Sequence, residues 1–238
     1  MLHRLYKWLL EIYFNIRLMR LKELIVGTKA WEDYWTKRKR GKDWHGKGKD
    51  WVKATFESID HPHRKLVVEA VSRFEPSSIL EVGCASAPNL RLLAVKYSKA
   101  EIWGVDINQR AVEYGNTMFR QDGFKFVNLM LGSADKLLFA EKTFDVVLTD
   151  AMLIYIGKDK IRQVMTKLVD IAKKGLVLVE WHIDGVGIDG VYRNALWQRD
   201  YVELIHEFAP RAIVSVKRIT KEIWPEWSET GCIIEARL

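Results

Sequence analysis

Residues 78–94 constrain the fold of this chain more than any other stretch, with the sequence Ser-Ile-Leu-Glu-Val-Gly-Cys-Ala-Ser-Ala-Pro-Asn-Leu-Arg-Leu-Leu-Ala. The apolar run over 78–82 predicts a buried strand, the small residues of 83–87 predict a tight turn, and the leucines that follow predict a helix over 89–97. Such a turn presents backbone N–H groups to a ligand. In doubly wound α/β folds, nucleotide-like ligands bind in the crevice at the carboxyl end of the first strand, so this turn is the first candidate site.

After this turn the chain alternates apolar runs with helical patterns, which is the rhythm of an open, mostly parallel sheet. Further strands are predicted over 101–106, 125–131, 144–150 and 175–181, and helices over 108–120 and 158–172; another helix, over 60–74, precedes the turn. Segments 212–219 and 231–238 are separated by a turn-rich stretch and suit a closing antiparallel pair. The sequence therefore predicts one α/β domain over 55–238, preceded by an extension over 1–54.

The 238 residues carry a formal net charge of +7, and the basic excess lies at the start of the chain. Residues 1–65 hold 16 Lys and Arg against 8 Asp and Glu, whereas the remainder is nearly neutral. The two cysteines, Cys84 and Cys232, form no metal-ligand spacing, so neither a disulfide framework nor a metal site is expected. A reducing, cytoplasmic location is the default expectation for such a chain.

Four carboxylates fall at or just beyond the carboxyl ends of the predicted strands. They are Glu81, Asp106, Asp135 and Asp150. Asp106 follows the turn by about twenty residues, where a carboxylate can accept both hydroxyls of an adenosine ribose. The alternative is that Asp106 only caps the next helix. Asp135 follows the third strand, where an Asp side chain can take the exocyclic amine of an adenine.

The ordered series of motifs resembles that of the class I S-adenosylmethionine-dependent methyltransferases. Residues 79–84 (Ile-Leu-Glu-Val-Gly-Cys) are similar to the first motif of that family, 104–108 (Gly-Val-Asp-Ile-Asn) to the second, and 133–135 and 144–155 to the third and fourth. The resemblance implies a Rossmann-like, seven-stranded, mostly parallel sheet with helices on both faces and an antiparallel last strand. A Rossmann dehydrogenase is disfavoured, because the turn lacks the later glycines of that class.

The resemblance also implies where S-adenosylmethionine binds. Glu81 and the turn would face its methionine part, Asp106 and Ile107 its ribose, and Ala134 and Asp135 its adenine. The expected cofactor contacts are Glu81, Gly83, Cys84, Ala85, Asn89, Asp106, Ile107, Ala134, Asp135 and Asp150.

One departure from the family concerns the turn itself. Ala85 and Ala87 stand where the family usually has glycine, and each alanine is strained if its φ must be positive. The departure leaves two alternatives to full activity open: weaker cofactor binding, or a non-catalytic adaptor.

Methyl transfer needs in-line placement of a nucleophile and, for some acceptors, a base. The candidates near the ends of the fourth and fifth strands are Asp150, Tyr155, Glu180 and His182. His182 is the best general-base candidate because the ordinary pKa of histidine lies near neutral. The alternative is that Glu180 lines the pocket and His182 is a loop residue. No Asn/Asp-Pro-Pro-Tyr follows the fourth strand, which argues against transfer to DNA bases or glutamine amides.

In this family the acceptor is set by segments outside the shared core. Residues 184–210 are expected to form a lid that carries Tyr192, Arg193, Trp197 and Arg199 over the pocket. The two arginines would suit a carboxylate or phosphate, so we expect a small-molecule, sugar or lipid-linked acceptor of anionic character. His61 and His63 are further candidates for substrate contact, with structural roles as the alternative.

Residues 2–26 contain neither Gly nor Pro and place polar side chains at helical spacing, which predicts one amphipathic helix ending near Gly27. Glu11, Arg17 and Arg20 interrupt its apolar run, so it is neither a transmembrane span nor a signal peptide. Its apolar face suits a membrane interface, so peripheral membrane attachment is a hypothesis. Packing on its own domain or on a partner chain is the alternative.

Residues 31–53 mix basic side chains with Trp31, Trp35, Trp44 and Trp51. Such a mixture can hold a nucleic-acid backbone, an anionic lipid head group or an acidic metabolite, or it can be a solvated, partly mobile loop whose tryptophans dock on the domain. RNA methylation is therefore an alternative function, although no recognisable nucleic-acid module accompanies the segment. The oligomeric state is left open.

Overall fold

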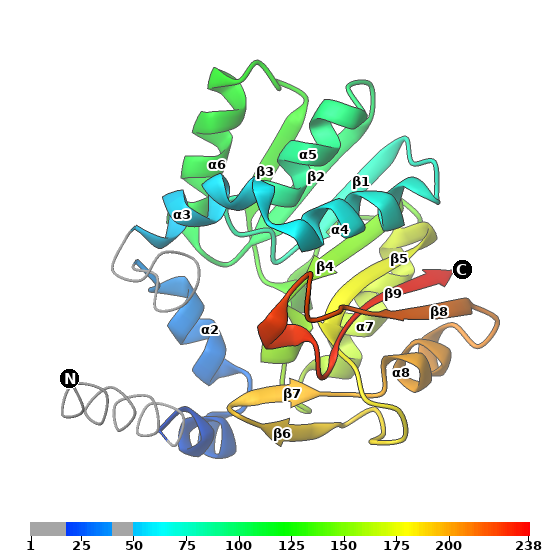
Figure 1. The fold of residues 1–238 in the computed structure, drawn as a ribbon. Coiled ribbons are helices and arrows are strands. Elements are labelled where there is room, and N and C mark those ends of the chain that lie inside the picture. Colours follow the sequence, from blue (N-terminus) through cyan, green and yellow to red (C-terminus); the bar gives the residue numbers. More distant parts are fainter. Residues whose placement is uncertain (1–17, 40–49) are drawn as a thin grey trace.

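The computed structural model describes residues 18–39 and 50–238. At its centre is a seven-stranded sheet in the order β3-β2-β1-β4-β5-β9-β8 (Figure 1). Its strands are β1 Ser78–Val82, β2 Glu101–Asp106, β3 Val127–Leu131, β4 Phe144–Asp150, β5 Ala172–Trp181, β8 Ile213–Arg218 and β9 Gly231–Arg237. Strands β1 to β5 pair in parallel, whereas β9 lies antiparallel between β5 and β8. The predicted Rossmann-like sheet with an antiparallel last strand is confirmed.

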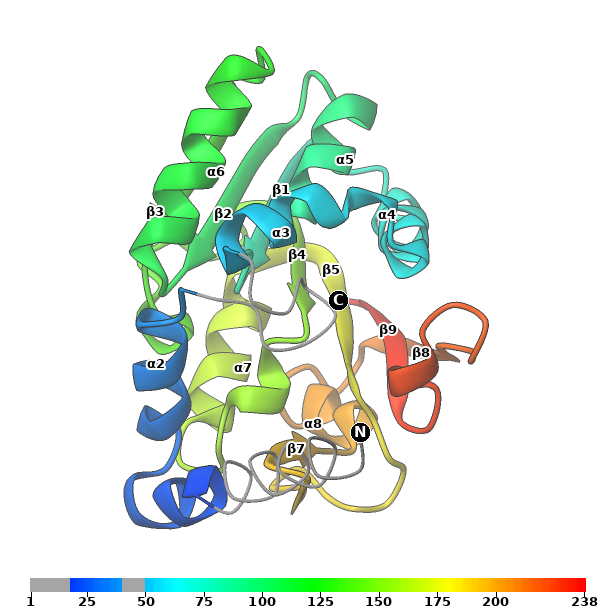
Figure 2. The same cartoon turned by 60° about the vertical axis from the view of Figure 1, so that its left-hand side comes forward.

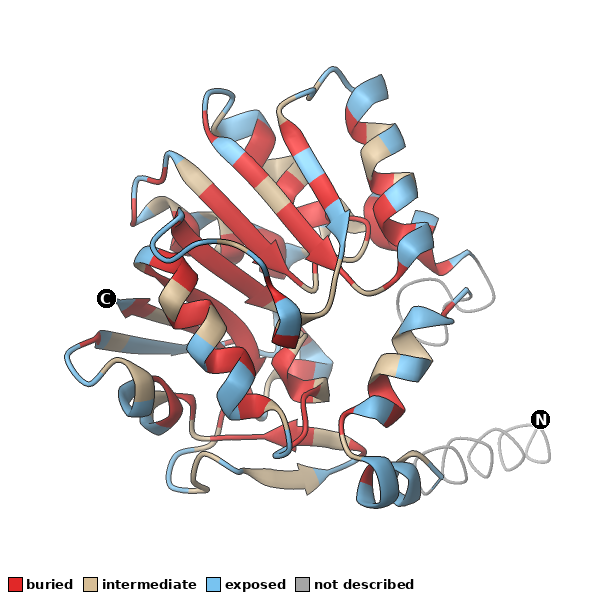
Figure 3. Cartoon of the chain, turned by 180° about the vertical axis from the view of Figure 1, so that it is seen from behind, coloured by how far each residue is buried: buried red, intermediate tan, exposed pale blue. Residues whose placement is uncertain are grey.

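Helices cover both faces of this sheet (Figure 2). The longer ones are α4 Pro62–Ser72, α5 Pro88–Lys96, α6 Gln109–Gln121, α7 Ile161–Ile171 and α8 Tyr201–Phe208. Successive side chains of a strand point to opposite faces, so Ile79 packs in the layer of α4, α5 and α6 while Leu80 packs in the layer of α7 and α8. Because both faces are covered, the central strands are buried (Figure 3).

The described parts of 31–53 belong to two helices and the residues next to them. Helix α2 covers Lys29–Thr36 and carries Trp31 and Trp35, and helix α3 covers Trp51–Glu57. The Asp50 carboxylate caps α3 by accepting from the backbone N–H of Val52, 3.0 Å away. Trp44 lies outside the described residues.

Residues 184–210 hold more regular structure than the sequence predicted. They form a hairpin of β6 Val191–Arg193 and β7 Leu196–Gln198, followed by α8. Asp200 begins α8 by accepting from the backbone N–H groups of Val202 and Glu203 at 3.1 and 3.0 Å. Short 3-10 helices complete the described chain: η1 Ser58–Asp60, η2 Ala134–Lys136, η3 Leu153–Tyr155 and η4 Pro225–Trp227.

Residues 18–26 are helical, and this helix ends where the sequence predicted, at Gly27 with a φ of +60°. The earlier part of the predicted helix, 2–17, lies outside the described residues. The aliphatic side chains of 18–26 do not pack on the domain: Leu24 and Ile25 are 76% and 72% exposed. None of the helices in the described ranges is both long and apolar enough to cross a membrane.

Candidate active site

A cavity of about 220 Å³ lies where the carboxyl ends of β1, β2 and β4 face α2 and α3. It is lined by all ten residues predicted to contact the cofactor: Glu81, Gly83, Cys84, Ala85, Asn89, Asp106, Ile107, Ala134, Asp135 and Asp150. Of the predicted catalytic residues, Asp150 and Tyr155 line it, whereas Glu180 and His182 do not. The sheet explains this convergence, because the carboxyl ends of neighbouring parallel strands meet at one edge.

The turn after β1 follows a left-handed path at three positions. Gly83 has a φ of +79°, and a Cβ added there would overlap the side chain of Met152. Ala85 and Ala87 also have positive φ values, +51° and +66°, at a cost of about 1 kcal/mol each relative to glycine. Their methyl groups are packed, however: Ala87 is fully buried in the core and Ala85 packs against the small cluster that contains Trp51. This packing offsets part of the strain.

Asp106 ties the end of β2 to this turn. One carboxylate oxygen accepts from the backbone N–H of Ala85 and the other from that of Asn108, each at 2.7 Å. Burial raises the pKa of Asp106 to about 6, although these backbone hydrogen bonds oppose the rise. Each oxygen keeps a second lone pair, so the carboxylate can still accept from a ligand hydroxyl in the cavity. The helix cap is made instead by Asn108, whose side chain accepts from Ala111 N–H.

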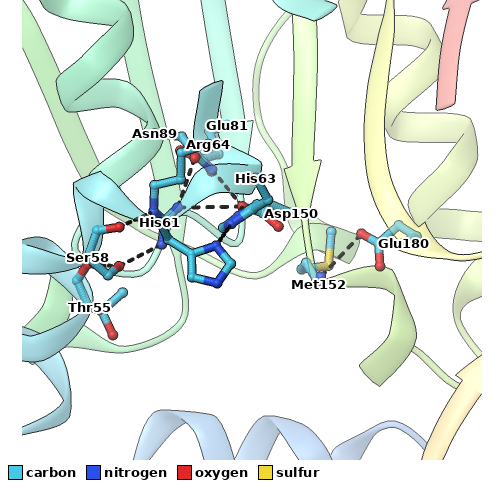
Figure 4. A network of polar contacts seen from close by, with 10 residues as sticks. All are labelled: Thr55, Ser58, His61, His63, Arg64, Glu81, Asn89, Asp150, Met152 and Glu180. Carbon is cyan, nitrogen blue, oxygen red and sulfur yellow. Dashed lines mark hydrogen bonds and ion pairs between the residues drawn. The ribbon is translucent and has the colours of Figure 1, made fainter. Parts of the chain in front are cut away.

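Asn89, in the first turn of α5, joins three ionisable groups at the cavity (Figure 4). Its amide nitrogen donates to Glu81 at 2.7 Å and to Asp150 at 2.9 Å, and its oxygen accepts from Arg64 at 2.8 Å. Burial raises the pKa of Glu81 to about 8. The guanidinium of Arg64 is held further by the backbone oxygen and the hydroxyl of Ser58, so its position is fixed.

Asp150 lies at the end of a chain of histidines that the sequence left undecided. His63 Nε2 is 3.0 Å from the Asp150 carboxylate, and His63 Nδ1 is 2.5 Å from His61 Nδ1 (Figure 4). Burial alone would raise the pKa of Asp150, but the nearby charge and hydrogen bond of His63, together with Arg64 and Asn89, hold it below its ordinary range. The ring of Trp224 covers both imidazoles, with centroids 4.4 Å from His63 and 4.9 Å from His61.

A lysine that the sequence did not single out joins α2 to the opposite end of the cavity. Lys160 lies 2.8 Å from Asp135 and 2.5 Å from Glu32 of α2. Although burial raises the pKa of Asp135, the bonds from Lys160 and Ser133 outweigh it, so the net pKa is lowered. Asp135 is thus a charged acceptor at the edge of the cavity.

Aromatic rings form the wall of the cavity that faces away from the sheet. Trp31 and Trp35 each contact Tyr155, with ring centroids 4.8 and 4.9 Å away, and Trp51 adjoins Trp35 at 5.4 Å. Trp224 and Trp227 stack at 4.3 Å and line the cavity as well. The concentration of tryptophan in 31–53 signalled this wall, but nothing in the sequence around Trp224 placed it there.

Glu180 and His182 have placements that differ from those expected of catalytic groups. Glu180 is fully buried and accepts from Thr149 and from the backbone N–H groups of Met152, Leu153 and Ile154 at 2.8 to 3.2 Å, which fixes η3. His182 is buried against α8, where its Nδ1 accepts from Tyr201 N–H at 3.1 Å and its Nε2 contacts Asp184 at 2.9 Å. The His182 ring is therefore part of the scaffold, not of the cavity.

The expected lid over the pocket is wrong for both arginines. Arg199 is fully buried, and it donates to the backbone oxygens of Leu153 and Ile156 at 3.1 and 2.5 Å. Arg193 is exposed, and neither it nor Tyr192, Trp197 or Arg199 lines the cavity. Arg199, directly after β7, instead supports η3, because a buried arginine can satisfy the carbonyl groups that a short helix leaves unpaired.

Comparison with known proteins agrees with the fold and the cavity. Residues 79–175 match the model of a methyltransferase domain. The chain carries a class I S-adenosylmethionine-dependent methyltransferase domain. It is an enzyme of this class, with S-adenosylmethionine as its cofactor, and it acts on a substrate to be methylated. No curated protein matches the sequence significantly.

Solved structures with the same fold cover most of the methyltransferase chain. Magnesium protoporphyrin IX methyltransferase (ChlM) from Synechocystis PCC 6803, with bound S-adenosylmethionine, is 14% identical at a TM-score of 0.63 and covers 88% of this chain and 96% of its own. A methyltransferase from Aquifex aeolicus is 16% identical at 0.55, over 77% and 96% of the two chains. One from Methanosarcina mazei is 19% identical at 0.51, over 67% and 91%. At these identities the likeness shows the fold.

The cavity is chemically suited to S-adenosylmethionine, which carries a sulfonium, an amino group and a ribose. Two buried carboxylate oxygens that line it, Glu81 Oε2 and Asp150 Oδ1, have no hydrogen-bond partner among the described residues. Buried acceptors of this kind require a donor, and a cationic ligand supplies one. At Gly83 the turn has no room for a side chain. The residues present therefore fit the methyltransferase cofactor.

Proposed function

We propose that this methyltransferase acts on a small-molecule, sugar or lipid-linked acceptor whose body is flat or apolar. The observation that carries the proposal is the set of aromatic residues Trp31, Trp35, Tyr155 and Trp224, which line the cavity together with Glu81, Asp106 and Asp150. Aromatic rings bind apolar and aromatic bodies through large contact areas at a small cost in side-chain entropy.

An anionic acceptor, as the sequence suggested, has less support. The cations that line the cavity, Arg64 and Lys160, already pair with the carboxylates Asp150, Asp135 and Glu32 in the described structure. A paired cation offers less to a ligand carboxylate or phosphate than a solvent-facing one. The proposal therefore rests on the aromatic lining of the cavity, and it does not specify the charge of the acceptor.

When bound, the cofactor supplies an electrophilic methyl group on its sulfonium. We assign Asp106 and Ile107 to its ribose, Ala134 and Asp135 to its adenine, and Glu81, Asp150 and the turn from Gly83 to Ala85 to its methionine part. Asn89 holds Glu81 and Asp150 side by side, so that their remaining oxygens face the same part of the cavity.

We assign proton removal from the acceptor to His63, with Asp150 as its orienting partner. His63 lines the cavity, and its contact to a buried carboxylate fixes its ring and stabilises the charged imidazolium that would form. His63 Nε2 faces Asp150 and its Nδ1 faces His61 at 2.5 Å, so the acceptor must take the place of His61 at Nδ1, where the proton is then received. His182, the base predicted from sequence, lies outside the cavity and has no part in this proposal.

RNA methylation receives no support of this kind. In the basic segment, Arg38 is buried and stacks over Trp35 and Trp51, with its guanidinium carbon 4.6 and 5.3 Å from the ring centroids. The Arg38 guanidinium therefore stabilises the aromatic wall and is not exposed to bind the phosphate backbone of a nucleic acid. Lys37 and Lys39 are exposed, whereas Arg40 lies outside the described residues.

A product screen tests the acceptor class. Purified protein is incubated with trideuteromethyl S-adenosylmethionine and two panels, one of aromatic or lipid-linked alcohols and amines and one of compact polar metabolites, and gain of one labelled methyl is measured by mass. We expect products from the first panel, and their loss with Trp31→Ala but not with Trp103→Ala, a tryptophan outside the cavity. Products from the polar panel alone would contradict the proposal.

A further inference from the structure

The helix over 18–26 shows a row of aliphatic side chains to solvent. Leu24 and Ile25 are 76% and 72% exposed, Leu21 and Val26 are 55% and 50% exposed, and Leu18 is 39% exposed. Isolated exposed leucines are ordinary, but five aliphatic residues exposed within nine are a contiguous patch that marks an interaction surface.

The charges of this helix are sorted by sign. Glu23 is its only acidic residue, and it is buried, with its carboxylate accepting from Trp197 Nε1 of β7 at 3.0 Å. Burial raises the pKa of Glu23. Arg20 and Lys22 are exposed. The surface that this helix offers to a partner therefore contains aliphatic side chains and cations, and no anion.

The cations also flank the aliphatic stripe. Residues in a helix are turned by about 100° from one to the next, so Leu18, Leu21 and Ile25 share one face. Arg20 and Lys22 then lie on opposite sides of Leu21. Long basic side chains in such positions reach up to phosphate groups while their stems lie along apolar surface. Aliphatic side chains with cations next to them suit the boundary between acyl chains and anionic head groups.

The helix is joined firmly to the active site. Thr28, directly after Gly27, accepts from Gly157 N–H at 2.7 Å and donates from its hydroxyl to Asp159, also at 2.7 Å. Helix α2 begins at Lys29, and its residues Trp31, Glu32 and Trp35 line the cavity. Figure 1 shows the helix over 18–26 at the end of α2, beside the β6–β7 hairpin.

We propose that residues 18–26 form a membrane-binding surface that lies in the head-group region of an anionic phospholipid bilayer. Binding in this way places α2, and with it the aromatic wall of the cavity, next to the bilayer. An acceptor dissolved in or linked to the membrane reaches the cavity from that side. The last step rests on the proposed function, whereas binding to the bilayer does not.

Vesicle flotation of the full-length protein tests the surface. The probes are phosphatidylcholine vesicles with and without phosphatidylglycerol. The test variant is Leu24→Glu with Ile25→Glu, and the matched control is Ile213→Glu with Leu138→Glu, since Ile213 and Leu138 are 73% and 94% exposed on other segments. A third variant, Arg20→Glu with Lys22→Glu, reverses only the flanking charges. Circular dichroism and calorimetry with S-adenosylmethionine are recorded for each protein.

We expect the wild type and the matched control to float with anionic vesicles, and both test variants to partition more than about tenfold less. Equal flotation of all four proteins, or flotation of none, overturns the proposal. Light scattering tests whether the protein forms dimers. A concentration-dependent dimer that persists with vesicles and is lost in Leu24→Glu with Ile25→Glu would also overturn the proposal, because this face would then join two copies of the chain. Cofactor binding is read separately, so a failure of the methyltransferase assignment would be seen in the calorimetry and not in the flotation.

Discussion

The carboxylate of Asp106 accepts a hydrogen bond from the backbone N–H of Ala85, 2.7 Å away. This bond joins the end of β2 to a turn whose alanine has a positive φ. A left-handed alanine persists only when its surroundings hold it there, and Asp106 supplies one of those restraints. The residue assigned to the ribose and the residue that departs from the family pattern therefore support each other.

Replacing Asp106 with asparagine should destabilise the protein even without a ligand. Asn presents one oxygen and one amino group, so the amino group would face either Ala85 N–H or Asn108 N–H, both of which are donors. We expect the free energy of unfolding in urea to fall by about 1–3 kcal/mol. Glu113→Gln on the exposed face of α6 is the control and should change it by less than about 0.5 kcal/mol.

The stability of the ligand-free protein should fall as the pH rises from 5 to 8. Burial raises the pKa of Glu81 from its ordinary 4.5 to about 8, and those of Glu180 and Asp106 to about 7 and 6. In this window the unfolded chain has released these protons while the folded protein still holds them, so rising pH favours unfolding. Thermal unfolding across this range measures the fall.

Glu81→Gln separates stability from function at the same position. Gln can still accept from Asn89 but has no charge to lose, so the variant should be more stable than the wild type at pH 8 and show a flatter pH dependence. It should also bind S-adenosylmethionine more weakly, since Glu81 can release its proton and become an anion beside a bound cation, whereas Gln cannot. A variant that is destabilised at pH 8 and binds the cofactor normally would refute both statements.

Glu180→Gln should act on the scaffold and not on proton transfer. The carboxylate accepts four hydrogen bonds, and the amide nitrogen of Gln cannot accept any of them. We expect a loss of about 1–3 kcal/mol in unfolding free energy and a lower rate of methyl transfer, because η3 positions Tyr155. The shape of the pH–rate profile should stay unchanged. A lost limb of that profile would instead place Glu180 in the chemistry.

His63→Gln should slow methyl transfer by roughly 10²- to 10⁴-fold while leaving cofactor affinity within a few-fold of the wild type. Gln keeps a polar contact with Asp150 but cannot take up a proton. His182→Gln is the comparison, and we expect it to affect stability more than rate, because that ring accepts from the backbone of α8. The measurement is the initial rate against pH with an acceptor from the product screen. An unchanged rate in His63→Gln would exclude it as the base.

Local sequence signals were sufficient for the sheet and for the cofactor side of the cavity. Strand ends, the turn at Gly83 and the carboxylates at Asp106 and Asp135 are each read from a few neighbouring residues, and parallel pairing brings them together without further information. The same reasoning failed at β5, where position near a strand end suggested a catalytic role for Glu180 and His182, neither of which lines the cavity. Whether a side chain at a strand end points to the cavity or to η3 depends on tertiary packing.

The proposed acceptor side could be predicted only in part. The sequence marked His63 and the tryptophans of 31–53 as candidates, but it could not join them to one another or to Trp224, because these residues come from distant segments. Trp31 belongs to α2, His63 to α4 and Trp224 to the loop before η4, and no local pattern links them. Arg199 shows the opposite error. Its sequence context suggested a ligand-binding cation, but Arg199 is buried and donates to the carbonyl groups of Leu153 and Ile156. Burial of a charge is a property of the fold and leaves little trace in a single sequence.

Calorimetric titration of S-adenosylmethionine into the wild-type protein tests the central claim most directly. We expect saturable binding with measurable heat, a rise in the unfolding temperature with cofactor concentration, and an affinity at least about tenfold lower for Asp106→Asn. Neither heat nor thermal stabilisation at millimolar cofactor would contradict the account, since the cavity under the turn at Gly83 would then not be a methyltransferase cofactor site.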